Sequence, residues 1–164
     1  MVHATSEALS LLINAGPRRI DRWSDKPPIL VFTDGAVEEG ANKVTHGALL
    51  LDPVNQHSLV FGDHVPQMFV NAWMRFGKRQ VIAQTEIFPV LVAKETWANV
   101  LAGRSVLWFL DNESAKMALI RIFSPILDSF LLLQTNAKLD LETQSKNWYS
   151  RVPSRSNPSD CIST

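Results

Sequence analysis

Cysteine and long apolar runs are scarce in this sequence. Its 164 residues include one cysteine, Cys161, so no disulfide can form within the chain, and a reducing intracellular compartment, cytoplasm or nucleus, is the default. Apolar runs such as 106–110 and 130–133 are far shorter than the ~20 residues that span a bilayer. The N-terminus lacks the basic start and apolar core of a signal peptide. We therefore expect an intracellular protein with no membrane partner.

Net charge is absent too, because sixteen lysines and arginines balance sixteen aspartates and glutamates. Proteins that bind a polyanion usually carry excess basic charge, so this balance at first argues against a nucleic-acid partner. The sequence has no Walker A, G-x-G-x-x-G or G-x-S-x-G motif, which leaves NTPase, dinucleotide-binding and serine hydrolase functions unsupported. No metal-ligand spacing relates its four histidines, His3, His46, His57 and His64.

The order of apolar patterns predicts an α/β domain. Short β-rich runs predict strands over 29–33, 43–51, 58–61, 105–110 and 147–152. Helical patterns cover 85–101, 113–123 and 124–141, the last beginning with Ser124 as N-cap. Since proline is tolerated only in the first turn of a helix, Pro89 places the first of these helix starts close to Thr85. The order βββαβααβ predicts a central mixed five-stranded sheet flanked by helices.

Two regions flank or interrupt this pattern. Residues 4–14 are predicted to form a short amphipathic helix, and the turn-rich segment 15–28 a linker. We therefore divide the chain into an N-terminal helix and linker, 1–28, and a main domain, 29–164. Residues 64–83 show no clear pattern.

Three acidic residues stand where strands and helices would bring them together. Asp34 and Asp111 each follow a buried strand, and adjacent parallel strands end at the same edge of a sheet. Glu86 shares a helix face with Val90 and Ala93, so it should point toward the sheet. Glu95 lies nine residues further along, on roughly the opposite side of the helix.

Converging carboxylates need protons or cations. Two of them ~4 Å apart repel by about 4 kcal/mol at an effective dielectric of ~20, and oxygen ligands without cysteine or histidine favour Mg²⁺ or Mn²⁺. Such a cluster suits two-metal phosphodiester chemistry. The alternative for any one aspartate is an ordinary turn residue or helix cap, because aspartate before Gly35 or Asn112 is common in that role.

Four acidic motifs occur in an order that resembles a known family. They are Asp34 in VFTDGA, Glu86 in IAQTEIFPVLVA, Asp111 in LWFLDNESA and Asp160 in RVPSRSNPSD. With the strand order, they resemble the ribonuclease H superfamily, specifically the ribonuclease H domain that follows reverse transcriptase in retroelements. The closing phrase WYSRVPSRSNPSDCIST is similar to the retroelement pattern around the last aspartate.

The resemblance implies an enzyme that hydrolyses the RNA strand of RNA–DNA hybrids. The four acidic residues would ligate two Mg²⁺ ions, for which Mn²⁺ would substitute, and an adjacent polymerase domain would be a partner. Residues 1–28 would be the end of a connection region. The expected substrate contacts are Asn112, Arg151, Arg155 and Asn157.

The sequence also departs from the family pattern. No histidine follows His64, whereas many members have one in the loop before the last aspartate; Arg151 or Ser154 stands there instead. The chain ends four residues after Asp160, where the family usually has a helix, so we expect a domain without that helix, as a compact variant or a polyprotein fragment. These departures motivate the alternative of a catalytically silent scaffold or interaction module.

The acidic site also changes how the net charge is interpreted. If four of the sixteen acidic residues form the site, sixteen bases face twelve acids, and the rest of the chain carries +4 (16 − 12). Three bases and no acid lie between Thr143 and Ser159. The zero net charge is therefore compatible with a modest grip on nucleic acid.

Overall fold

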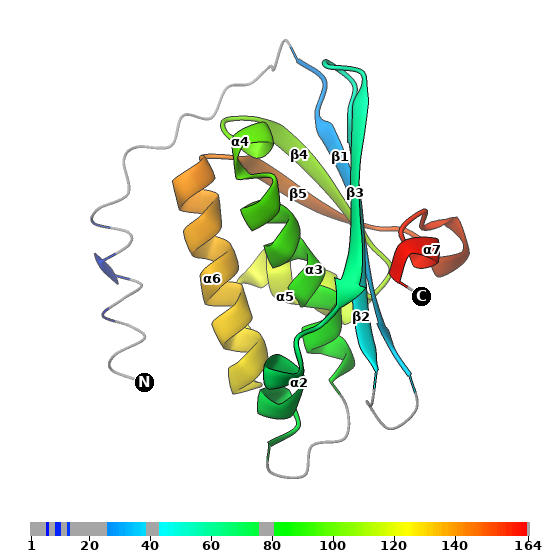
Figure 1. The fold of residues 1–164 in the computed structure, drawn as a ribbon. Coiled ribbons are helices and arrows are strands. Elements are labelled where there is room, and N and C mark those ends of the chain that lie inside the picture. Colours follow the sequence, from blue (N-terminus) through cyan, green and yellow to red (C-terminus); the bar gives the residue numbers. More distant parts are fainter. Residues whose placement is uncertain are drawn as a thin grey trace.

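A five-stranded mixed sheet forms the centre of the protein (Figure 1). The structure is a computed structural model. It describes residues 26–38, 43–75 and 81–163 and the isolated positions 6, 9, 10 and 13. The expected helix over 4–14 and most of the linker over 15–28 lie outside the described residues. The strands are β1 (Ile29–Val37), β2 (Val44–Asp52), β3 (His57–His64), β4 (Ser105–Leu110) and β5 (Lys146–Arg151), in the spatial order β3-β2-β1-β4-β5.

The strand pairing is as the element order predicts. β1 pairs antiparallel with β2, and β2 with β3, while β4 pairs parallel with both β1 and β5. The helices are α2 (Gln67–Trp73), α3 (Ile82–Thr96), α4 (Ala98–Leu101), α5 (Glu113–Arg121), α6 (Leu127–Thr143) and α7 (Asp160–Ser163), with a 3₁₀ turn η3 (Ser154–Ser156). The α/β class and the mixed five-stranded sheet are thus confirmed.

The core lies between one face of the sheet and the helices α3, α5 and α6 (Figure 1). Strand β4 shows why, because Val106, Trp108 and Leu110 are buried and alternate with half-buried residues. Ile87 and Val90 of α3 complete this core. Helix α7 lies on the other side of the sheet and contacts β1 and β2. No helix in the described part of the chain is long and apolar enough to cross a membrane.

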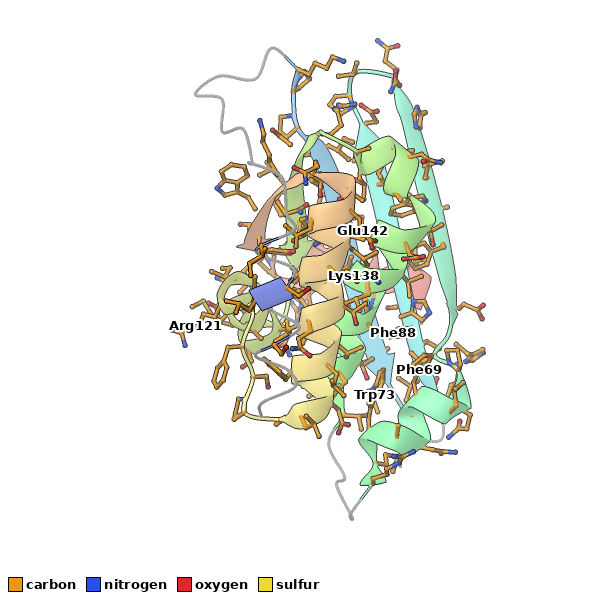
Figure 2. All side chains as sticks on the ribbon, turned by 90° about the vertical axis from the view of Figure 1, so that its left-hand side faces the viewer. Phe69, Trp73, Phe88, Arg121, Lys138 and Glu142 are labelled. Carbon is orange, nitrogen blue, oxygen red and sulfur yellow. The ribbon has the colours of Figure 1, made fainter. Side chains whose placement is uncertain are left out.

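Helix α2 occupies the region in which no pattern was found. Its Trp73 packs against Phe88 of α3 with ring centroids 5.7 Å apart, and Phe69 approaches the same ring at 5.3 Å. Figure 2 shows these three aromatic side chains together at one end of the helical layer. Only a few side chains anchor this short helix, which explains its weak sequence pattern.

The prediction that Pro89 lies in a first helical turn is wrong. Helix α3 begins at Ile82, so Pro89 lies inside it and cannot donate a backbone hydrogen bond to the carbonyl of Thr85. Strand β1 passes close to that carbonyl, since a Cβ built on Gly35 would lie 2.4 Å from Thr85 O. The expected single helix over 85–101 is also two helices, which Trp97 separates.

Two further expectations about helix ends need correction. Helix α5 ends at Arg121, because Ile122 adopts a left-handed conformation with φ 51°. Helix α6 begins after Ile126 rather than at Ser124, whose Oγ accepts a hydrogen bond of 3.2 Å from the backbone N–H of Ile126. Ser124 therefore supports the turn before the helix instead of capping it.

A buried lysine joins three elements of the core. Lys94 of α3 is 0% exposed, and its Nζ donates to Asn136 Oδ1 at 2.6 Å and to Asp140 Oδ1 at 2.5 Å on α6. It also donates to the Tyr149 hydroxyl of β5 at 2.9 Å. A buried cation is tolerated only when it is paired and hydrogen-bonded in this way, so the cluster fixes α3 against α6 and β5.

Candidate metal centre

Asp34 and Asp111 meet because of the parallel register between β1 and β4. Phe32 pairs with Phe109, and two further steps along both strands bring Asp34 level with Asp111. The expectation that Asp34 ends its strand is wrong, since β1 continues to Val37. Strand β4 ends at Leu110. Next to Asp34, the edge of β1 that faces β4 therefore has no strand paired with it.

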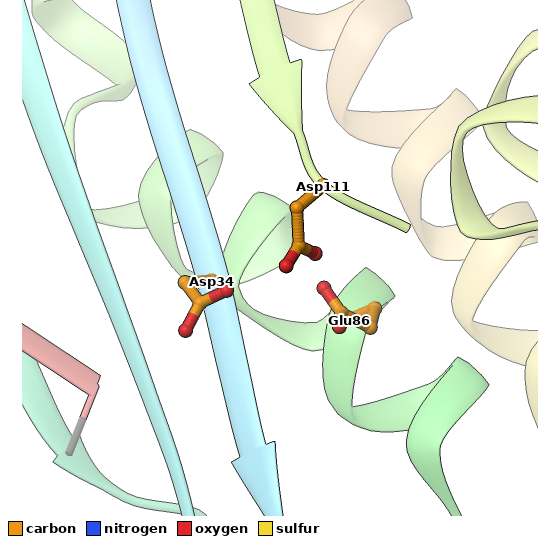
Figure 3. A group of neighbouring side chains, drawn as sticks. All are labelled: Asp34, Glu86 and Asp111. Atoms are coloured by element: carbon orange, nitrogen blue, oxygen red, sulfur yellow. The ribbon is translucent and has the colours of Figure 1, made fainter. Parts of the chain in front are cut away.

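Glu86 reaches this edge of β1 from α3. Its side chain is 5% exposed, and Asp34, Glu86 and Asp111 each offer an oxygen within 4.8 Å of the others. Figure 3 shows the three carboxylates directed toward one another. The close approach of Gly35 to the α3 backbone allows this, because it brings β1 against the turn that carries Glu86.

The electrostatics of the group follow from burial and mutual repulsion. Burial raises the pKa of Glu86 to about 9, and the negative charges of Asp111 and Asp34 contribute to the same shift. Burial also raises the pKa of Asp34, an effect that the hydrogen bond from Ser163 opposes and that the charges of Asp111 and Asp160 reinforce. Without a cation, Glu86 is therefore protonated at neutral pH.

The donor set fits a hard divalent cation. Glu86 Oε2 and Asp111 Oδ1 are buried acceptor atoms without a hydrogen-bond partner among the described residues. Burying an acceptor without a partner costs free energy, and a bound cation would offset that cost. All three ligands are carboxylate oxygens, which Mg²⁺ and Mn²⁺ prefer. A cation would displace the Glu86 proton and relieve the repulsion at once.

The fourth expected acidic residue lies outside this group. Asp160 is the first residue of α7 and is exposed, and it is not among the carboxylates within 4.8 Å of one another. Its charge nevertheless acts on Asp34, whose pKa it helps to raise. The structure thus brings three of the four acidic residues together and places the fourth nearby.

Asn157 anchors the segment that carries Asp160. It is 4% exposed, and its Nδ2 donates to the carbonyl of Thr33 on β1 at 3.0 Å. Its Oδ1 accepts from Ser159 Oγ at 2.7 Å. These contacts hold the segment beside Asp34, and a contact between Asn157 and substrate stays a prediction.

The other expected substrate residues lie at the end of β5 and on the segments that follow β4 and β5. Arg151 is exposed at the end of β5, and its Nε donates to the backbone carbonyl of Asp111 at 3.1 Å. Arg155 is exposed in η3. Asn112 caps α5, because its Oδ1 accepts from the backbone N–H of Ala115 at 3.0 Å. Their contacts with substrate likewise stay predictions.

Two serines at the site escaped sequence analysis as partners of the carboxylates. Ser154 Oγ donates to Asp111 Oδ2 at 2.7 Å, and Ser163 Oγ donates to Asp34 Oδ2. The only available signals were the place of Ser154 in the loop before Asp160 and the spacing of one helical turn between Asp160 and Ser163. Neither signal identifies a carboxylate partner more than forty residues away in the sequence.

Comparisons with known proteins find similar structures but no similar sequence. No protein-family model and no curated protein matches the sequence. Solved ribonucleases H are nonetheless similar in structure. One is ribonuclease H1 from the halophilic archaeon Halobacterium salinarum, with a TM-score of 0.64 and 16% identity, covering 84% of this chain and 95% of that one.

The second comparison concerns LC11-RNase H1, isolated from compost by a metagenomic approach. It has a TM-score of 0.65 and 13% identity over 83% of this chain and 92% of that one. The same protein in complex with an RNA/DNA hybrid matches with a TM-score of 0.55 and 14% identity, over 82% and 93% of the two chains. At these identities the comparisons establish that the chain has the ribonuclease H fold.

Proposed function

We propose that the protein is a divalent-metal-dependent endonuclease that hydrolyses the RNA strand of RNA–DNA hybrids. The observation that carries this proposal is the group of three converging carboxylates at the end of β4 in a ribonuclease H fold. A structural neighbour that binds an RNA/DNA hybrid supports the choice of substrate. The order of the acidic motifs supports a setting in a retroelement reverse transcriptase, beside a polymerase domain.

The proposed metal ligands are the acidic residues of the site. Asp34, Glu86 and Asp111 would hold the divalent ions, for which we propose two Mg²⁺, and exposed Asp160 would join them from α7. Bound metal supplies activation of water and stabilisation of charge on the phosphate. Glu86 would give up its proton to a bound cation, because its raised pKa reflects burial and repulsion that a cation would offset.

Substrate would be held by groups around this centre. Arg151 is exposed next to Asp111, and Arg155 is exposed in the 3₁₀ turn η3 that follows β5. Guanidinium groups bind phosphate oxygens well, and we therefore propose that both arginines contact the phosphate backbone of the hybrid. Such contacts position the substrate without reading its sequence.

A cleavage assay with a labelled RNA–DNA hybrid and Mg²⁺ tests the proposal. We expect cleavage of the RNA strand by the wild type, and a loss of at least roughly 100-fold in Asp111→Asn and Glu86→Gln. Glu95→Gln is the matched control, because Glu95 is an exposed glutamate of the same helix. The proposal fails if the wild type does not cleave, or if Asp111→Asn cleaves equally well.

The position of Asp160 outside the group favours a second candidate, a catalytically silent ribonuclease H-like scaffold. Such a module would need the fold but not the metal. Calorimetric titration with Mn²⁺ distinguishes the two functions, since a scaffold should show no binding that depends on Asp34 and Asp111. Binding that Asp111→Asn abolishes counts against the scaffold.

A further inference from the structure

The segment that follows β5 contacts two of the three carboxylates through serine hydroxyls. Ser154 in η3 donates to Asp111 Oδ2 at 2.7 Å, and Ser163 in α7 donates to Asp34 Oδ2. Asp34 and Asp111 lie on different strands, whereas both serines belong to one stretch of ten residues. One short segment therefore acts on both aspartates of the centre.

The hydrogen bond to Asp111 leaves a specific atom open. Ser154 engages Oδ2, while Oδ1 of the same carboxylate is buried and has no partner among the described residues. A carboxylate held through one oxygen loses most of its rotational freedom, and the other oxygen then keeps one direction. Hydrogen bonds of this kind to metal ligands raise metal affinity by fixing the ligand before the ion arrives.

Ser163 connects Asp34 with the helix of the fourth acidic residue. It is 1% exposed, and besides its bond to Asp34 its Oγ lies 3.2 Å from the carbonyl oxygen of Asp160. One buried hydroxyl thus joins β1 to the first residue of α7. A displacement of α7 would move Asp160 and release Asp34 together.

Contacts other than those of the two serines also hold the segment in position. Asn157, between them, is buried and bonds to the Thr33 carbonyl, and Val152 N–H donates to the Leu110 carbonyl at 2.8 Å. The serine hydroxyls can be removed while these anchors remain. Their contacts are therefore best explained by what they do to the carboxylates.

We propose that Ser154 and Ser163 are positioning residues, which hold one oxygen each of Asp111 and Asp34 so that these carboxylates are oriented for a divalent cation. The inference deepens the proposed function and rests on it. It assigns to the segment that follows β5, α7 included, a second task beside carrying Asp160.

Calorimetric titration with Mn²⁺ of the full chain, first freed of metal with EDTA, tests the inference without an activity measurement. We expect Ser154→Ala to bind Mn²⁺ roughly 10-fold more weakly than the wild type. Ser154→Thr keeps the hydroxyl and should restore the affinity to within about 2-fold. Ser156→Ala is the matched control, since Ser156 is an exposed serine of the same turn and should leave the affinity unchanged.

A second pair of variants tests Ser163. Ser163→Ala should weaken Mn²⁺ binding roughly 10-fold, whereas Cys161→Ala, at an exposed position of the same helix, should not. Thermal unfolding in EDTA checks that Ser154→Ala has the stability of the wild type, as expected for an exposed side chain. If Ser163→Ala unfolds at a lower temperature, the Ser154 variants decide the outcome.

The inference and the proposed function can fail separately. Unchanged Mn²⁺ affinity in Ser154→Ala, or an equal loss in Ser156→Ala, overturns the inference even if the wild type cleaves hybrids. A wild type that binds Mn²⁺ without cleaving hybrids overturns the function, while weaker binding by Ser154→Ala alone still supports the serine's role. Absence of Mn²⁺ binding to the wild type overturns both.

Discussion

At the scale of single residues, Glu86 sets the chemistry of the centre, since burial and two nearby aspartates raise its pKa from 4.5 to about 9. Below pH 4.5 the folded and unfolded states both carry the proton. As pH rises toward 9, only the unfolded state ionises, so the free energy of unfolding of the metal-free protein falls. A metal ligand thus costs stability when no metal is present.

Glu86→Gln should therefore stabilise the metal-free protein at alkaline pH. In EDTA at pH 8 we expect a gain on the order of 2 kcal/mol, or roughly 4–8 °C in Tm, and no difference at pH 4. Added Mg²⁺ should raise the Tm of the wild type but not that of the variant. Thermal unfolding at both pH values checks this, with Glu95→Gln as control; equal Tm values at pH 8 would contradict it.

At the scale of elements, the centre depends on how closely α3 approaches β1. Gly35 permits this approach, because a Cβ there would lie 2.4 Å from the carbonyl oxygen of Thr85, which is backbone and cannot rotate away. That carbonyl has no α-helical partner, because Pro89 lacks an N–H. The irregularity of α3 and the glycine of β1 thus meet one residue away from Asp34 and Glu86.

Gly35→Ala should push α3 away from β1 and loosen the carboxylate group. We expect a loss of about 1–3 kcal/mol in the free energy of unfolding and weaker Mn²⁺ binding, measured by denaturant unfolding and calorimetry. Gly62→Ala is the comparison, since its Cβ would meet the Ile162 carbonyl of the short helix α7 at 2.5 Å. It should affect Mn²⁺ binding with a smaller loss of stability, and the reverse order of the two stabilities would contradict this account.

At the scale of the whole molecule, the predictable part of the site came from periodicity and strand order. The parallel, adjacent strands β1 and β4 bring Asp34 and Asp111 to one level, although β1 continues past Asp34. The helical repeat places Glu86 on the inner face of α3. The Lys94 cluster and the serine contacts could not be predicted, because neither strand order nor helical periodicity relates these side chains to their partners. Pro89 was misleading, because the rule that restricts proline to the first helical turn takes no account of tertiary contacts such as the approach of Gly35 to the Thr85 carbonyl.

The distribution of charge across the molecule predicts how it binds nucleic acid. Outside the four acidic residues assigned to the site, the chain carries +4 (16 − 12). Arg151, which bonds to the Asp111 carbonyl, and Arg155, which follows Ser154, are both exposed. Neutralising phosphates releases counterions, so the logarithm of the binding constant falls with the logarithm of salt concentration by nearly one unit per contact. A modest surplus of this kind implies few contacts and a shallow salt dependence.

Removing one of these arginines should therefore reduce the salt dependence by a definite step. Fluorescence anisotropy with a labelled RNA–DNA hybrid and Ca²⁺ in place of Mg²⁺ measures binding at several salt concentrations. Arg155→Ala should lower the slope by about 1. Lys138→Ala, at an exposed position of α6 (Figure 2) where Lys138 pairs with Glu142, should leave it unchanged. Equal slopes in all three proteins would remove Arg155 from the phosphate contacts, because a contact with phosphate cannot be lost without a change in counterion release.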